Sequence, residues 1–117
     1  MDIREFYVAV GGSYDEVLAR LPLEKMIVSF VKRFPGDGSY GQIRPALRDR
    51  NYQEAFRFAH SLKGASFNLG FGSLTQSASA LCEALRGGGE PKEGLSGLLG
   101  QVDRDYESTV SCIAGLD

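Results

Sequence analysis

Residues 59–70 read AHSLKGASFNLG, and they hold the only histidine of the 117-residue chain. Asn51 and Glu54 form the pattern of a helix N-cap, and Gly70 is typical of a helix end, so the spacing predicts a helix over about 52–69. Gly64 stands inside this helix, where glycine costs about 1 kcal/mol relative to alanine. A histidine one turn away from such a glycine calls for a physical explanation.

The predicted helix separates into two faces when residues are placed at about 100° intervals. The core face is apolar or small and comprises Ala55, Phe58, Ala59, Leu62, Ala65, Ser66 and Leu69. His60 points about 160° away from Leu62, and Gly64 lies about as far round on the other side. Lys63, Phe56 and Phe67 lie beside the histidine. We therefore expect an exposed imidazole, with room for a partner at Gly64.

An exposed imidazole could serve three kinds of chemistry. As a metal ligand it lacks partners, because there is no second histidine and neither Cys82 nor Cys112 is suitably spaced. As a general base it would need a nucleophile and an orienting acid in a pocket. As a phosphoryl acceptor it needs a ring nitrogen that is neutral near pH 7 and a nearby cation, which Lys63 supplies. We interpret His60 as a phosphoryl acceptor, with no metal site and no cofactor of the protein's own.

The remainder of the chain also shows helical periodicity. The pattern predicts a short helix over 2–10, a turn or two opened by Ser13, a weaker helix over about 40–49 that contains Pro45, and a last long helix that starts at Pro91. A further helix is expected to end before Gly87, Gly88 and Gly89. Short glycine-rich turns between helices indicate an antiparallel bundle.

One more helix is predicted to start at Pro22, and its apolar residues recur at helical spacing. The stripe expected to face the core comprises Leu23, Met26, Ile27, Phe30, Val31 and Phe34. Pro35, Gly36 and Gly38 are expected to break this helix.

Charge and composition restrict the function. A formal net charge of −2 gives no electrostatic support for binding nucleic acid or an anionic membrane. No apolar run approaches the roughly 20 residues of a membrane span, and MDIREF lacks the basic start of a signal peptide. Cys82 and Cys112 suit small buried hydrophobes in a reducing compartment. We therefore expect a cytoplasmic protein with a single domain over residues 1–117.

AHSLKGASFNLG resembles the signature of bacterial histidine phosphotransfer (HPt) domains, A-H-x-L-K-G followed by L-G. The resemblance implies an all-α fold, an antiparallel four-helix bundle with a short additional N-terminal helix. It also implies that His60 is phosphorylated at Nε2, that Lys63 contacts the phosphate and that Gly64 gives a partner access. Related domains of chemotaxis kinases carry a glutamate that orients the histidine. An ungapped match puts Cys82 there, between Ser79 and Glu83, and leaves open which residue orients His60.

The resemblance further implies a phosphocarrier rather than an enzyme. His60 would accept a phosphoryl group from a receiver-domain aspartate or a histidine kinase and pass it to another receiver. The receiver would bring Mg²⁺. Phe56, Arg57 and Phe67 would bind the partner, a response-regulator receiver or a hybrid histidine kinase, and we expect a monomer. Two alternatives stay open: a helical adaptor that is not phosphorylated, and the phosphorylated domain of a longer chemotaxis-type kinase.

Overall fold

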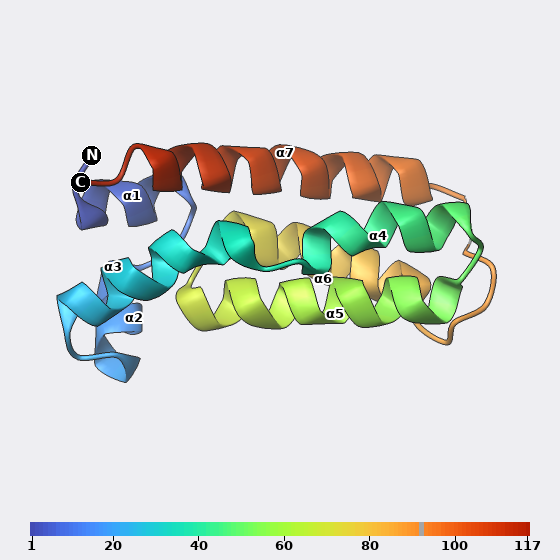
Figure 1. The fold of residues 1–117 in the computed structure, drawn as a ribbon, viewed down its shortest axis with the longest axis horizontal. Helices are drawn as coiled ribbons and strands as arrows, with labels where there is room; N and C mark the ends of the chain where they lie inside the picture. Colours follow the sequence, from blue (N-terminus) through green and yellow to red (C-terminus); the bar gives the residue numbers. More distant parts are fainter. Residues whose placement is uncertain (92) are drawn as a thin grey trace.

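A computed structural model describes residues 1–91 and 93–117, which are helical and contain no strand. The elements are α1 Ile3–Ala9, α2 Tyr14–Arg20, α3 Glu24–Arg33, the 3-10 turn η1 Phe34–Gly36, α4 Ser39–Arg48, α5 Tyr52–Leu69, α6 Gly72–Leu85 and α7 Leu95–Ala114. Helices α4, α5, α6 and α7 run side by side along the long axis, and α3 extends α4 (Figure 1). The predicted all-α, antiparallel four-helix bundle is confirmed, and three helices, α1, α2 and α3, precede it where one short additional helix was expected.

Helix α5 is bounded as its sequence predicts. The Asn51 side chain accepts a hydrogen bond from the Glu54 backbone N–H at 3.2 Å, which satisfies one of the free donors of the first turn. Gly70 ends the helix in the left-handed conformation, with φ of 76°. An added Cβ at Gly70 would also lie 2.5 Å from a methyl carbon of Val17, so both backbone and space favour glycine there.

Helix α4 is intact although Pro45 lies inside it. Contacts with α7 support this helix: the Tyr40 hydroxyl donates to Asp103 at 2.6 Å, and Arg44 Nη1 donates to the same carboxylate at 2.8 Å. The Tyr40 ring stacks on Tyr106 with a centroid distance of 3.8 Å. Tertiary contacts thus compensate for the poor helix propensity of this segment.

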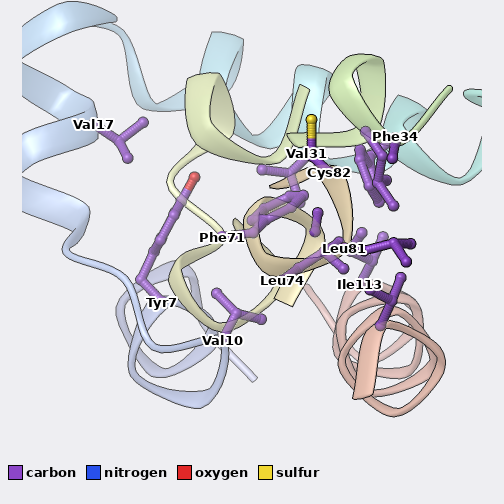
Figure 2. Packing of buried hydrophobic residues seen from close by; sticks show 14 of the residues in the cluster. Tyr7, Val10, Val17, Val31, Phe34, Phe71, Leu74, Leu81, Cys82 and Ile113 are labelled. Atoms are coloured by element: carbon purple, nitrogen blue, oxygen red, sulfur yellow. The ribbon is translucent and has the colours of Figure 1, made fainter. Parts of the chain in front are cut away.

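The core connects the bundle with the N-terminal helices. Figure 2 shows buried side chains of α1, α3, α6 and α7 converging, among them Tyr7, Val31, Leu74 and Ile113. The Tyr7 hydroxyl donates a hydrogen bond to the Leu69 carbonyl at 2.7 Å, which ties α1 to the end of α5. The two termini meet at the same end of the bundle (Figure 1), where the Asp117 N–H donates to the Met1 carbonyl at 3.0 Å. No helix in the described part of the chain is long and apolar enough to cross a membrane.

Two predictions about the helices are wrong. Helix α7 starts at Leu95 and not at Pro91, because Gly94 has a φ of 93° and cannot lie inside a right-handed helix. The part of that prediction that falls on Lys92 lies outside the described residues. Helix α3 also starts later than Pro22, with Leu23 as its N-cap.

The inward stripe of α3 is narrower than its sequence predicts. Ile27 and Val31 are fully buried, but Leu23, Met26 and Phe30 are 52%, 39% and 37% exposed. Helix α3 lies toward one end of the molecule (Figure 1), and of the predicted stripe only Ile27, Val31 and Phe34 are buried. Half of the predicted apolar stripe therefore faces solvent.

Candidate functional site

His60 lies on the exposed face of α5, about midway along the helix. The ring of Phe56, one turn earlier, is 6.0 Å away from the imidazole between centroids and tilted by 44°. A shallow hollow of about 240 Å³ is lined by Phe56, Arg57, His60 and Ser61. The core face of α5 is on the other side, with Ala55, Ala59, Leu62 and Ser66 buried. The exposure predicted for His60 from helical geometry is therefore correct.

Gly64 lies one turn after His60, and the space beside it is open. A Cβ built at this position would meet no atom within 4 Å, apart from the adjoining backbone of its own helix. Packing against another element therefore does not explain the glycine. Because glycine has no side chain, the helix backbone is accessible next to the imidazole, and a second molecule can approach it closely there.

Lys63 is half-buried and lies on α5, three residues after His60. Burial raises the pKa of the Cys82 thiol, and the positive charge of Lys63 partly opposes that rise. The pKa of Glu83 is lowered, chiefly by its hydrogen bonds to Arg86 and also by the charge of Lys63. The charge of Lys63 therefore acts on two groups of α6, Cys82 and Glu83.

None of the three candidates for orienting His60 binds its ring. Cys82 is fully buried, Ser79 is half-buried, and Glu83 forms an ion pair with Arg86 at 2.6 Å. No described residue forms a hydrogen bond with the imidazole. The ring is accordingly held by its own helix and by the neighbouring Phe56.

The three expected partner-binding residues lie on either side of His60. Arg57 is exposed and paired with Glu54, and Phe56 is half-buried. Phe67 is 61% exposed, two helical turns after His60, about 10 Å along the axis. The structure therefore brings Phe56 and Arg57 together with His60 in the hollow and leaves Phe67 outside it.

Two arginines near this face were not predicted as site residues. The Arg86 guanidinium lies 5.4 Å above the Phe56 ring, and that of Arg20 lies 5.6 Å above the Phe67 ring. Arg86 follows α6 and Arg20 ends α2, so the periodicity of α5 carries no signal for either. Each contact has the geometry of a cation–π interaction.

Across residues 1–91 and 93–117, no group of three or more histidine, cysteine, aspartate or glutamate side chains is placed to hold a metal ion. What the arrangement offers is an exposed imidazole, a lysine one turn later and an unobstructed approach. These are the requirements of a nucleophile that reacts with a group carried by another molecule.

Comparison with known proteins adds one match. The family model described as Hpt domain matches residues 38–107, a range that includes His60, Lys63 and Gly64 and extends from the start of α4 into α7. Searches of the curated proteins and of the solved structures found no match.

Proposed function

Because this chain belongs to the Hpt domain family, whose members carry phosphoryl groups in two-component signalling, we propose that it is a phosphorelay intermediary that uses His60. It accepts a phosphoryl group from a receiver-domain aspartate, or from a histidine kinase, and passes it to another receiver. The observation that carries this proposal is the exposed His60 imidazole beside Lys63, with open space at Gly64.

The transfer forms one bond and breaks one. The lone pair of a neutral imidazole nitrogen, which the family resemblance assigns to Nε2, attacks the phosphorus of the aspartyl phosphate. The bond from phosphorus to the carboxylate oxygen breaks, and its electron pair leaves with the aspartate. The proton on the other ring nitrogen stays in place. In the reverse direction, the imidazole is the leaving group.

Lys63 supports this step electrostatically in the proposal. A phosphoryl group in transfer carries negative charge on its three outer oxygens, and nearby cations stabilise that charge. Lys63 follows His60 by three residues, within reach of a group bound to the exposed ring nitrogen. The Mg²⁺ ion belongs to the receiver domain, which also supplies the aspartate.

We propose that the whole of residues 1–117 forms one such domain, in the cytoplasm and as a monomer. In support of one domain, α1 packs its Phe6 and Tyr7 into the core of the bundle, although both precede the matched range. Phe56, Arg57 and Phe67 provide contact area for the receiver around His60.

A phosphorylation assay tests the function. Purified protein is incubated with a receiver domain, acetyl phosphate and Mg²⁺, and the receiver supplies the phosphoryl group. We expect the protein to gain a phosphate that is labile in acid and stable in alkali, as phosphohistidine is. A protein that binds receivers and never becomes phosphorylated would instead be a helical adaptor.

A further inference from the structure

A second exposed surface lies where α2, α3 and the end of α5 meet. A cavity of about 650 Å³ opens there, and its apolar lining includes Leu21, Phe34, Ala65 and Leu69. Its rim carries Arg20, Phe30 and Arg33. The partly exposed Leu23 and Met26 lie on the same side of α3 as Phe30, within about 60° of each other. Apolar surface that is exposed in this way commonly marks an interaction site.

The rim of this cavity is cationic. Arg33 lies 5.7 Å above the Phe30 ring, and Arg20 lies 5.6 Å above the Phe67 ring. Neither guanidinium forms an ion pair within the described ranges, 1–91 and 93–117. The one carboxylate in the lining, Asp37, accepts a hydrogen bond from the Ser39 N–H at 2.8 Å. Two unpaired arginines beside an apolar hollow favour a partner that presents carboxylates around apolar side chains.

This surface is continuous with the face that carries His60. Phe67 follows His60 by seven residues, so the two side chains point within about 20° of each other and lie about 10 Å apart along α5. A molecule that covers His60 and extends toward the end of α5 therefore reaches Phe67 and Arg20. Phe67 and Arg20 line one hollow together, and Arg20 also lines this cavity. The exposed Asn68 is the α5 residue of the cavity wall that lies nearest to His60 around the helix, at about 80°.

We infer that this cavity is a second contact site for the receiver domain, and that it selects among receivers. The inference rests on the proposed phosphotransfer function. It adds where on the surface the receiver is recognised and which residues recognise it. Arg20, Phe30 and Arg33 all precede residue 38, where the match to the family begins. The family pattern thus leaves them unspecified, and a surface built from them can differ between proteins that share the same histidine helix.

A second copy of this chain fits the surface less well. In a two-fold symmetric dimer, the same patch of both copies would face itself. Arg20 and Arg33 of one copy would then lie near their own equivalents, and like charges brought together oppose association. An acidic receiver surface meets no such repulsion.

The test compares two charge reversals. The variant Arg20→Glu/Arg33→Glu changes the rim of the cavity. The control Lys25→Glu/Lys32→Glu changes the same number of charges on exposed residues, both more than about 100° around α3 from Phe30. Each protein is first phosphorylated with phosphoramidate, a small donor that needs no docking surface. Transfer to a panel of purified receiver domains from the same organism is then timed with Mg²⁺ present.

We expect phosphoramidate to load all three proteins equally. The arginine variant should lose about tenfold or more in kcat/KM toward the receivers that the wild type prefers, mainly through KM, because it weakens docking and leaves the chemistry intact. The lysine control should transfer like the wild type. Equal rates for all three proteins, or equal slowing of both variants, would overturn the inference.

Two measurements separate this inference from the proposed function. Binding of unphosphorylated protein to the same receivers should weaken in the arginine variant alone, a result that does not depend on phosphorylation. Failure of the wild type to accept phosphate from any donor would refute the proposed function. The binding measurement would then still test whether the cavity is a docking site. Sedimentation of the wild type as a dimer that Phe30→Ser dissociates would show that a second copy covers the surface, which would refute the inference.

Discussion

At Gly64, an added Cβ would meet no neighbouring atom within 4 Å, so the glycine can be replaced without a clash. Gly64→Ala should raise the free energy of unfolding by up to about 1 kcal/mol, because alanine is the better helix former. Gly64→Gln should also fold, yet its side chain would stand beside His60 and slow transfer with a receiver. Thermal melting and transfer rates check both variants. Loss of folding in Gly64→Ala would mean that the glycine serves packing.

Lys63 is expected to act on the transferred phosphoryl group. Lys63→Ala should slow transfer about tenfold to a hundredfold, equivalent to about 1.4–2.8 kcal/mol of transition-state stabilisation. Stability should change little, since the side chain is only half-buried. Lys32→Ala, on the exposed side of α3, is the matched control. If rates of the two variants are the same, Lys63 has no part in transfer.

The exposure of His60 could be predicted from residue spacing alone, because every relevant residue lies on α5. The arginines above Phe56 and Phe67 could not be predicted in this way. Arg86 and Arg20 come from other elements, and their positions depend on how α6 and α2 pack against α5. The same holds for the effect of the Lys63 charge on Cys82, which belongs to the neighbouring helix α6.

At the scale of the helices, Asp103 joins α4 to α7. Hydrogen bonds from Arg44 and then Tyr40 hold the pKa of Asp103 below its ordinary value, against the opposing effect of burial. Burial and the bond to Asp103 raise the pKa of Tyr40 to about 12, so the phenol stays protonated and keeps donating at neutral pH. The contact between α4 and α7 therefore depends on an ionised Asp103.

Asp103→Asn should lower the free energy of unfolding at pH 7 by about 1–2 kcal/mol. We expect a value at the low end of this range, because the Arg44 side chain is about half exposed and solvent screens its charge. A lowered folded-state pKa means that the stabilisation is present above the unfolded pKa of about 3.9 and is lost as the pH falls through the folded value. The difference between wild type and variant should therefore shrink below about pH 4. Urea unfolding against pH measures it, with Glu107→Gln on the exposed side of α7 as control. A difference that does not depend on pH would contradict the assignment.

The predictions for whole helices held where local signals agreed and failed where tertiary structure decided. For α5, a cap at Asn51, an apolar stripe and a terminal glycine all point to the same boundaries. The start of α7 depended on the conformation of Gly94, which its sequence does not reveal. For α3, the apolar stripe correctly indicated a helix, but only the final packing determined that Leu23, Met26 and Phe30 stay exposed.

For the whole molecule, the N-terminal helices should unfold together with the bundle. Phe6 is fully buried and packs edge-on against Phe71, with ring centroids 5.7 Å apart. Phe6→Ala should therefore cost about 3–5 kcal/mol and should lower the midpoint of a single unfolding transition. Val8→Ala, at an 80% exposed position of the same helix, should have little effect. Two separate transitions in the wild type would show that residues 1–37 do not belong to the same cooperative unit.

The account as a whole depends on His60 as the phosphorylated residue, and mapping the phosphate tests this most directly. The wild type and His60→Gln are each incubated with phosphoramidate, and phosphate is located by mass spectrometry of peptides kept at alkaline pH. His60 is the only histidine of the chain and lies outside the core, so the variant should fold normally. We predict an acid-labile phosphate on His60 in the wild type and none in the variant. An acid-labile phosphate that persists in His60→Gln, or a wild type that takes up none, would contradict the account.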